Sequence, residues 1–510
     1  MIKILLINPV WGKQRENEVS YALGLGYIIA SLKQSSSVTL IDLHNHHKWS
    51  DLTNTLVENE YQLVGISLYC GDIDYFSHVT NILNLIMAIS PNSILTVGGP
   101  YPTFAYKELL EQFVNIHYVI LGEGETVFHQ IAEKIKSGNM EGITAIKGIA
   151  YRQGKEIIAN ENPGIDLNKI PIPAWDDIIF NRNKIDYIPI CIARGCINHC
   201  SFCSITLDQN RRIKFRNIAS IAEEIKYLTD RFGAKKFYFM NSDFFCYSKY
   251  AEQIIQFAAD EDAISEYAIT TRVDSALKNY SIFEKAISGK CRSIELGIES
   301  MSDTQLIRYN KKVTVQENRS CIEKVQRTIS NNKNINLNID FIMFDPYTTV
   351  NELEDNINFF FHYKLCSVFY EKCLYTYMKL FHGTEIRKTA LNDQLYYDNI
   401  FNMNYRFFHK ETEGVYAALL SYKNMFQDKL EDISSRLSMI YSMDSYNKFS
   451  KIQKMKLYKI FSIRNNITFN FFKECLHSYS KLDLLHIYQN KIEAMKIDID
   501  QILQEGIKYE

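Results

Sequence analysis

The sequence predicts two successive α/β domains and a mainly helical region behind them. Short aliphatic segments alternate with helical patterns over roughly the first 380 residues, which is the spacing of parallel strands joined by helical crossovers. The residues beyond are rich in Tyr and Phe, follow helical periodicity and contain few Gly. A chain of 510 residues is long enough for about three domains of roughly 150 residues each.

These patterns divide the chain into four segments. They are a first parallel-sheet domain, a linker, an α/β domain that forms a partial (β/α)6 barrel, and a helical domain, over residues 1–144, 145–184, 185–380 and 381–510.

Five aliphatic segments predict the strands of the first sheet. Their bounds are 2–8, 38–42, 63–69, 93–98 and 118–122. Helical patterns at 25–33 and 75–89 lie between them, so we expect a doubly wound, Rossmann-like (flavodoxin-like) parallel sheet. Ligands of such sheets bind beyond the carboxyl ends of the strands. Polar and glycine-rich loops at three strand ends supply the candidate binding residues Ser67, Tyr69, Gly98, Gly99, Thr103, Glu123, Gly124 and Glu125.

A hairpin-like segment at 148–155, followed by Pro163, Pro171 and Pro173, indicates the linker. Six segments beyond it predict the strands of the second domain. Their bounds are 187–193, 236–240, 267–271, 293–297, 335–344 and 367–378. In a regular sixth strand Phe369, Tyr375 and Tyr377 share one face, which meets either substrate or the outside of the domain.

Composition excludes several classes of protein. Lys+Arg 57 against Asp+Glu 59 leave a net charge of -2, so no global basic field attracts nucleic acid or an anionic membrane. No apolar run reaches the ~18 residues of a membrane span, and the start lacks a secretory cleavage site, so we expect a cytoplasmic protein. The 11 cysteines are then reduced thiols or metal ligands.

Three of these cysteines form the most specific motif of the sequence. Cys196, Cys200 and Cys203 follow the first strand of the second domain with the spacing Cys-x3-Cys-x2-Cys. A structural zinc ion would need a fourth ligand, for which His199 or Cys191 is available. Three thiolates on a cubane iron–sulfur cluster instead leave one iron free to bind a substrate or cofactor. The tight loop favours the cluster, and zinc is the alternative.

With the aromatic Phe202 just before the third cysteine, the motif resembles the signature of the radical S-adenosylmethionine enzymes. The resemblance implies a [4Fe–4S] cluster held by the three cysteines, whose open iron binds the amino and carboxylate groups of S-adenosylmethionine. Reduction of the bound cofactor then releases a 5′-deoxyadenosyl radical, which abstracts a hydrogen atom from substrate. The resemblance also implies a cofactor contact for Phe202 and an external electron donor of the flavodoxin or ferredoxin type.

Further strand ends match cofactor-binding positions of that family. Asn241 and Asp243, after the second strand, occupy the place of a polar loop that contacts the methionine amino group. Arg272, after the third strand, matches a position near the cofactor carboxylate, and Glu299 closes the fourth strand in the segment around the ribose. Any one of them could be only a helix cap or turn former. Their occurrence after successive strands favours cofactor binding.

The first domain resembles the cobalamin-binding domain that precedes the radical domain in one large subgroup. The resemblance covers about residues 1–140, and the segments that carry it are 5–9, 23–27, 65–67, 97–103 and 122–125. Their glycines allow the backbone to approach a macrocycle or its nucleotide tail, and their hydroxyl and carboxylate groups offer hydrogen-bond partners. The resemblance further implies a cobalt without a protein histidine below it and a loop at 11–21 near that face.

The leading hypothesis is therefore a cobalamin-dependent radical S-adenosylmethionine enzyme, and preferentially a methyltransferase of an unactivated carbon in a small-molecule natural product or a peptide. Relatives with the same two domains also catalyse rearrangement, ring contraction or cyclisation without methyl transfer, which is the alternative. An alternative from another class is a sensor that binds the same cofactors without catalysis. Such a sensor would need an output surface, for which the sequence offers only the unassigned helical region. The helical region 381–510 either caps the second domain, to exclude water from radical chemistry, or serves packing or dimerisation.

Overall fold

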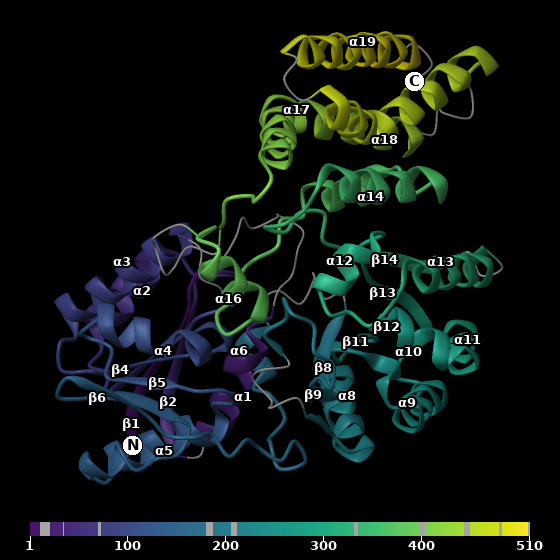
Figure 1. Ribbon diagram of the computed structural model, residues 1–510. Coiled ribbons are helices and arrows are strands. Elements are labelled where there is room, and N and C mark those ends of the chain that lie inside the picture. Colours follow the sequence, from purple (N-terminus) through teal and green to yellow (C-terminus); the bar gives the residue numbers. More distant parts are fainter. Residues whose placement is uncertain are drawn as a thin grey trace.

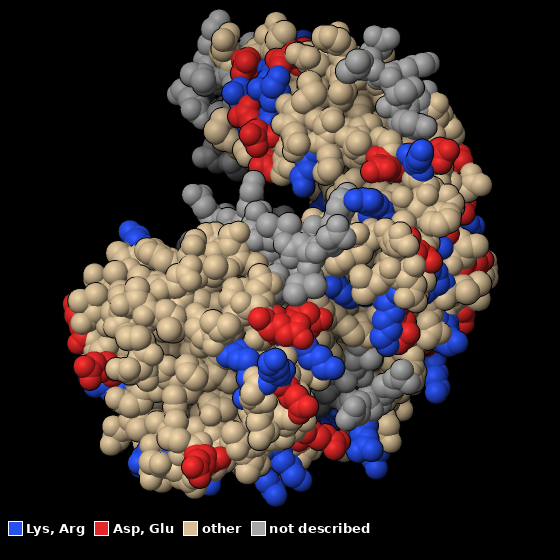
Figure 2. Space-filling model, turned by 60° about the vertical axis from the view of Figure 1, so that its left-hand side comes forward, with Lys and Arg blue, Asp and Glu red and all other residues tan. Residues whose placement is uncertain are grey.

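The computed structural model describes residues 1–10, 21–33, 35–69, 73–179, 187–205, 212–330, 335–396, 404–442, 449–478 and 482–507. Two parallel sheets follow one another along the chain, each covered by helices, and a bundle of long helices stands beyond the second sheet (Figure 1). This arrangement confirms the predicted fold class. Lys and Arg are interspersed with Asp and Glu on the face shown in Figure 2, in keeping with the net charge of -2.

The first sheet has seven strands in the order β2-β1-β3-β4-β5-β6-β7. Its parallel strands are β1 (Ile2–Asn8), β2 (Ser36–Asp42), β3 (Leu63–Ser67), β4 (Ile94–Gly98) and β5 (Tyr118–Ile120). Its helices are α1 (Leu23–Leu32), α2 (Trp49–Glu58), α3 (Ile73–Ile89), α4 (Pro100–Gln112) and α5 (Glu125–Lys136). The hairpin expected at 148–155 is antiparallel to β5 and extends the sheet as β6 (Ile149–Gln153) and β7 (Glu156–Ala159).

The aliphatic run of β1 is buried because helices cover both faces of the sheet. Leu5 and Ile7 share a core with α2, α3 and α4, whereas Ile4 and Leu6 share one with α1 and α5. A strand buried on both faces favours a continuous apolar sequence over an alternating one. Because both faces are covered, the polar loops of the domain lie at the carboxyl edge of the sheet.

The second sheet has five parallel strands in the order β14-β13-β12-β11-β8. The strands are β8 (Ile188–Cys191), β11 (Lys236–Met240), β12 (Glu266–Arg272), β13 (Cys291–Glu299) and β14 (Asn336–Phe341). The helices are α6 (Trp175–Ile178), α8 (Ile218–Phe232), α9 (Ser248–Asp260), α10 (Val273–Lys278), α11 (Tyr280–Ser288), α12 (Asp303–Arg308), α13 (Val315–Ser330) and α14 (Val350–His362).

The two faces of this sheet differ in polarity. Residues such as Phe239, Ile269 and Leu296 are buried in one core under the helices. Alternate positions carry polar groups, and the hydroxyl of Tyr238 lies 2.8 Å from that of Thr270, which donates to Glu295 at 2.9 Å. Because side chains alternate along strands, these polar groups line the face opposite to the helices.

The predicted sixth strand at 367–378 is wrong. That stretch forms the short helix α15 (Val368–Glu371) and a 3-10 turn (Lys372–Tyr375), and a single parallel bridge joins Phe344 to Tyr377. Side chains instead of backbone meet the edge of β14, because Tyr370 donates to the Leu337 carbonyl at 2.8 Å and the Cys373 thiol lies 3.7 Å from the Ile339 carbonyl.

The three aromatic residues of that stretch consequently do not share a face. Phe369 is exposed, whereas the ring of Tyr377 stacks on that of Tyr405 with centroids 4.1 Å apart. Lys423 lies over the ring of Tyr375 at 5.2 Å.

The C-terminal helices are α16 (Glu385–Asn392), α17 (Lys410–Ser442), α18 (Lys451–Ser478) and α19 (Leu482–Ile507). The last three pack on one another, and α18 also packs on α14 and α15. Among the described residues, no helix is both long and apolar enough to cross a membrane.

Candidate cofactor sites

The three motif cysteines lie on one loop at the carboxyl end of β8. The short strand β9 (Ala193–Gly195), paired with β10 (Ile213–Phe215), leads directly into Cys196. Cys196 is buried and its sulfur accepts from the backbone N–H of Asn198 at 3.5 Å. Cys200 and Cys203 are half-buried, and the Cys203 N–H donates to the Cys200 carbonyl at 3.2 Å. Every motif cysteine is thus placed by the same short segment.

The loop is held from both sides by distant segments. The Ser201 N–H donates to the Tyr309 carbonyl at 2.9 Å, and the Asn310 side chain donates to the His199 carbonyl at 2.7 Å. On the other side the Ile386 N–H of α16 donates to the Ser201 carbonyl at 3.2 Å. The Phe202 ring meets the Tyr309 ring edge-on at 5.6 Å. The sequence did not single out Tyr309, because only the fold brings it to this loop.

The described residues hold no group of three His, Cys, Asp or Glu side chains arranged around a single metal ion. A cubane cluster binds each thiolate to a different iron, so its ligands need not converge on one point. Of the two candidates for a fourth zinc ligand, Cys191 is fully buried and its thiol lies 3.7 Å from the Ala193 carbonyl. Burial raises the pKa of that thiol. His199 meets the Asn310 amide only through its backbone carbonyl.

Two cations lie beside Cys200. The Arg272 guanidinium donates to the Cys200 sulfur at 3.2 Å and to the Asp274 carboxylate at 2.9 Å. Burial raises the pKa of the Cys200 thiol, and the charges of Lys311 and Arg272 oppose that rise. Hydrogen bonds and positive charges at a ligating sulfur stabilise its thiolate and tune a cluster. Arg272 therefore contacts the cysteine loop itself. The prediction placed it near the cofactor carboxylate and did not include this contact.

Asn241 and Asp243 lie at the carboxyl end of β11 but are used differently. Asp243 is buried and accepts from the hydroxyls of Thr271 at 3.1 Å and Ser275 at 2.5 Å, so it ties β11 to β12. Burial raises the pKa of this carboxyl, and the hydrogen bond from Ser275 opposes the rise. The Asn241 side-chain N–H2 is buried and has no partner within the described part of the chain. An unpaired buried donor is costly, so this amide fits an acceptor group of a ligand.

Glu299 ends β13 in an unusual backbone conformation. Its φ of 65° lies in the left-handed region, which disfavours a residue with a side chain. The strand pairing with β14 shifts register at the same place, between Gly297 and Glu299. The buried carboxylate of Glu299 accepts from the Lys311 ammonium at 2.7 Å. The bulge thus aims an anchored carboxylate into the strand edge next to the cysteine loop.

The loops of the first sheet approach each other closely. A Cβ on Gly99, where φ is 110°, would lie 2.6 Å from the Leu68 carbonyl oxygen, so only glycine fits. The Thr103 hydroxyl donates to the Gly99 carbonyl at 3.0 Å and accepts from the Gly122 N–H at 2.8 Å. Thr103 therefore joins two of the predicted binding loops, with its neighbour Gly98 packed beside Ile120.

The loop after β3 carries Tyr69, an exposed residue among the predicted cobalamin-binding residues. The Ser67 carbonyl accepts from the Tyr75 hydroxyl at 3.3 Å, and the Tyr69 side chain is 55% exposed. Of the loop predicted near cobalt, at 11–21, only Tyr21 belongs to the described residues.

Glu123 and Glu125 join the first domain to the cysteine loop. Arg194, two residues before Cys196, places its guanidinium 3.3 Å from Glu123 Oε1 and 2.7 Å from Glu125 Oε1. Lys214 of β10 lies 2.6 Å from the other Glu123 oxygen. The Arg194 side chain is only 19% exposed and both carboxylates are buried. The sequence did not single out Arg194, although a charged residue just before the cysteine motif was a usable signal.

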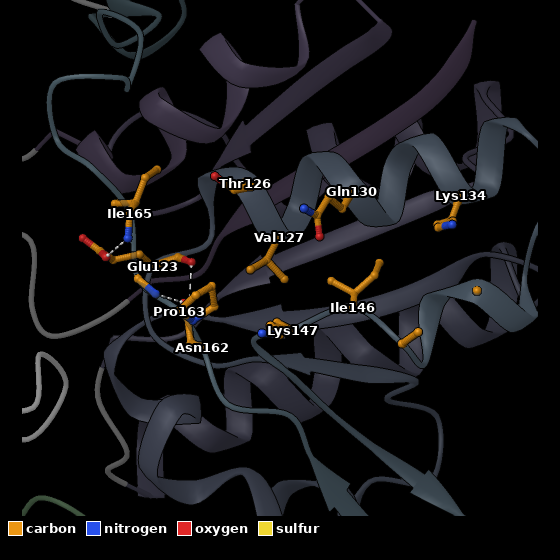
Figure 3. A pocket seen from close by; sticks show the side chains of 13 residues that line it. Glu123, Thr126, Val127, Gln130, Lys134, Ile146, Lys147, Asn162, Pro163 and Ile165 are labelled. Atoms are coloured by element: carbon orange, nitrogen blue, oxygen red, sulfur yellow. Dashed lines mark hydrogen bonds between the residues drawn. The ribbon is translucent and has the colours of Figure 1, made fainter.

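A pocket of about 340 Å³ lies beside Glu123, at the start of helix α5 (Figure 3). Helix α5 lines it with Thr126, Gln130 and Lys134, and the segment 162–165 lines the opposite side. The Asn162 side chain donates to the Glu123 carbonyl at 3.2 Å, and the Ile165 N–H donates to the Glu123 carboxylate at 2.9 Å. Gly124, between the two acids, begins helix α5 as its N-cap.

Two family matches lie within the two α/β domains. Residues 17–132 match the B12 binding domain, and residues 190–360 match the Radical SAM superfamily. Among curated proteins, an uncharacterized methyltransferase of Pyrococcus horikoshii is 25% identical over 369 residues, or 70% of this chain and 78% of that protein. An anaerobic magnesium-protoporphyrin IX monomethyl ester cyclase of Cereibacter sphaeroides is 27% identical over 318 residues, or 58% of this chain and 50% of the cyclase.

Two solved structures share the fold. The cobalamin-dependent S-adenosylmethionine radical enzyme OxsB, with aqua-cobalamin and S-adenosylmethionine bound, matches with a TM-score of 0.73 at 18% identity, covering 100% of this chain and 80% of OxsB. The radical S-adenosylmethionine methyltransferase TsrM of Kitasatospora setae, with cobalamin and a [4Fe–4S] cluster bound, matches with a TM-score of 0.61 at 17% identity, covering 77% of this chain and 78% of TsrM.

The matched families are those of the predicted cofactors, cobalamin for the first domain and S-adenosylmethionine with its iron–sulfur cluster for the second, so the predicted cofactors are confirmed. This chain belongs to the radical S-adenosylmethionine enzymes that carry a B12-binding domain.

Proposed function

We propose that this enzyme is a methyltransferase that acts on an unactivated carbon of a small-molecule natural product or a peptide. The observation that carries the proposal is the ion pair between Arg194 and Glu125, with Nη2 and Oε1 2.7 Å apart. It holds the cysteine loop against the carboxyl edge of the first sheet, which favours one reaction space between the two cofactors. The methyltransferase of Pyrococcus horikoshii supports methyl transfer as the outcome.

When bound, S-adenosylmethionine on the cluster supplies an organic radical and cobalamin supplies the methyl group. The chain supplies the framework for both. We assign Cys196, Cys200 and Cys203 to the cluster, and Phe202 to packing beside it. The guanidinium of Arg272 stabilises the Cys200 thiolate by its hydrogen bond of 3.2 Å.

We assign three further residues to S-adenosylmethionine. The unpaired side-chain N–H2 of Asn241 is available to a carboxylate oxygen of the cofactor. The Glu299 carboxylate, anchored by Lys311, is available to the ribose hydroxyls. Asp243 holds β11 and β12 together beneath them through its bonds to Thr271 and Ser275.

We assign the loops of the first sheet to cobalamin. The backbone at Gly98 and Gly99 has no side chains, so cobalamin can approach it closely. The Thr103 hydroxyl holds this backbone in place by its hydrogen bond to the Gly99 carbonyl. Ser67, Tyr69 and the backbone at Gly124 complete the edge. The carboxylates of Glu123 and Glu125 carry the domain contact with Arg194 at the same time.

We propose that residues 1–144 and 185–380 act as the cobalamin and radical domains, joined by 145–184, and that 381–510 caps them. The ring of His382 meets the Tyr101 ring of α4 at 5.1 Å, and α16 bonds to the cysteine loop at Ser201. A segment that touches both domains is suited to exclude water from a radical site.

Anaerobic reconstitution with iron, sulfide and hydroxocobalamin tests the proposal before a substrate is known. With a reductant of the flavodoxin type and S-adenosylmethionine carrying a deuterated methyl group, we expect S-adenosylhomocysteine and labelled methylcobalamin besides 5′-deoxyadenosine. The control is the Cys196→Ala, Cys200→Ala, Cys203→Ala variant, which should form no 5′-deoxyadenosine.

The relationship to a cyclase supports one alternative, a radical reaction without methyl transfer. In that case the loaded enzyme would form 5′-deoxyadenosine while cobalamin stayed unlabelled and no S-adenosylhomocysteine accumulated. This result would contradict the methyltransferase proposal and leave the radical chemistry intact.

A further inference from the structure

The first half of α18 extends beyond the body of the protein. Its second half packs on the radical domain, where Arg464 pairs with Glu371 at 3.0 Å and the Phe472 ring stacks on Phe344 at 6.0 Å. In the half before Arg464, the Phe461 ring meets the Tyr441 ring of α17, with centroids 6.1 Å apart. At 1.5 Å per residue, about a dozen residues project by roughly 18 Å. Figure 1 shows this bundle standing beyond α14.

Three apolar side chains of the projecting half are more exposed than its Phe461 and Ile463, which are 43% and 36% exposed. Ile452 is 70% exposed, Met455 64% and Tyr458 71%, whereas Leu457 and Ile460 on the opposite side are buried. A helix that already buries one apolar side in its bundle has no structural use for a second. The exposed apolar side chains therefore point to a ligand outside the chain.

Lysines lie between these apolar side chains. Lys451, Lys456 and Lys459 are exposed, and none of them has an acidic partner among the described residues. No Asp or Glu occurs from residue 449 to residue 473, although the whole chain has a net charge of -2. We call Lys451, Ile452, Met455, Lys456, Tyr458 and Lys459 the basic apolar face.

The charge of this face excludes one occupant and its spacing disfavours another. A second copy packed face to face would bring lysines together, which costs free energy. A partner groove that binds a helix needs apolar residues at i, i+3 or i+4, and i+7. Counted from Ile452, Met455 supplies the apolar i+3 position, but Lys459 occupies i+7, so charge interrupts the apolar row.

A lipid surface tolerates this alternation. Lysine stems lie along apolar surface while their ammonium groups reach the head groups, and Tyr favours the interface between lipid and water. We propose that the basic apolar face binds the surface of an anionic lipid bilayer. The expectation that the balanced net charge disfavours such membranes holds for the chain as a whole and not for this face. The proposal is independent of the methyltransferase assignment.

Sedimentation of the full-length protein with vesicles tests the proposal. We expect binding to vesicles that contain phosphatidylglycerol and little binding to vesicles of phosphatidylcholine alone. Replacement of Lys451, Lys456 and Lys459 by Gln should weaken binding at least about tenfold, because each lysine near an anionic surface contributes several-fold. Ile452→Gln with Met455→Gln should also weaken it, at unchanged far-UV circular dichroism.

The matched control replaces Lys226, Lys249 and Lys278, three exposed lysines of the radical domain, by Gln. Their loss should leave vesicle binding unchanged. An equal loss in the control, or no binding to phosphatidylglycerol vesicles, would overturn the proposal. Binding to a soluble acidic peptide without binding to vesicles, or self-association through the same face, would overturn it in favour of a protein partner.

Discussion

The carboxyl edges of the two sheets differ in how their polar groups are used. At the edge of the first sheet, Thr103 bonds to its neighbouring loops and Glu123 bonds to Arg194 and Lys214 within the chain. At the edge of the second sheet, the Asn241 side-chain N–H2 is buried without a partner among the described residues and Glu299 adopts a positive φ. Unsatisfied and strained groups cluster where a ligand repays their cost.

This comparison suggests that the first edge offers mainly backbone to cobalamin, whereas the second edge offers side chains to its cofactor. The acids at 123 and 125 then matter for both sites at once, because they fix the distance between the two edges.

The largest effect is expected at the cysteine loop. Cys200→Ala removes one thiolate and leaves the cluster with two, so bound iron and 5′-deoxyadenosine formation should fall below detection. Iron analysis and product analysis measure both quantities. Cys191→Ala is the control, because that thiol is buried beside Arg194 and the Ala193 carbonyl, and lies outside the Cys-x3-Cys-x2-Cys spacing. Loss of iron in the Cys191 variant would show that Cys191 is a fourth metal ligand, as in the alternative zinc site, and would contradict the three-cysteine cluster.

Arg194→Gln should have the next largest effect and should reach both edges. It removes the ion-pair partner of the buried Glu125 carboxylate, while Glu123 keeps Lys214, and this costs about 3 kcal/mol or more. We expect weaker cobalamin retention on gel filtration, by about tenfold to a hundredfold, together with a lower thermal midpoint. Arg194→Lys should restore part of the retention.

Lys214→Gln is the matched control for Arg194. Lys214 pairs with the same Glu123 but its side chain is 29% exposed, so its loss should cost at most about 1 kcal/mol. Equal cobalamin retention in the Arg194 and Lys214 variants would break the claim that the cysteine loop is held by Arg194.

Gly99→Ala tests the backbone edge of the first sheet. The new Cβ would meet the Leu68 carbonyl at 2.6 Å in a left-handed conformation, so the loop must move. The positive φ alone costs about 1–2 kcal/mol. Cobalamin titration should show at least about tenfold weaker binding. Gly154→Ala, at φ 64° with nothing within 4 Å, should leave cobalamin binding unchanged.

Asn241→Ala should have the smallest effect on the fold. Removal of the unpaired N–H2 group favours the fold, whereas loss of the side-chain oxygen that accepts from the Asp243 N–H at 3.2 Å opposes it, so stability should change little. S-adenosylmethionine should bind about tenfold more weakly, equivalent to about 1.4 kcal/mol. Asn217→Ala makes the opposite change. Its side chain accepts from the Ser220 N–H at 2.8 Å and caps α8, so its loss should cost about 1 kcal/mol of stability without affecting that affinity.

Much of the fold could be predicted because its signals are local. The five aliphatic runs of the first sheet and the strands that end at Cys191, Met240 and Arg272 are continuous or alternating patterns within a few residues. The stretch at 367–378 was missed because its aromatic residues fit a strand as well as a helix. The choice depends on Tyr370 and Cys373 reaching the edge of β14, which is a tertiary contact.

The candidate site divides in the same way. The cysteine spacing and the glycine-rich loops are visible in sequence because each lies within one segment. The pair of Arg194 with Glu125, residues 69 positions apart, is formed only when two domains meet. The left-handed backbone at Glu299 is likewise a product of the register shift against β14.

The central claim is that the cysteine loop and the cobalamin edge face one reaction space. Pulsed electron paramagnetic resonance on the reconstituted enzyme tests it most directly, through the dipolar coupling between the reduced cluster and cob(II)alamin. We predict a resolved coupling in the unmutated enzyme and a weaker or broader one in Arg194→Gln loaded with both cofactors. Two bound cofactors without any coupling would contradict the account.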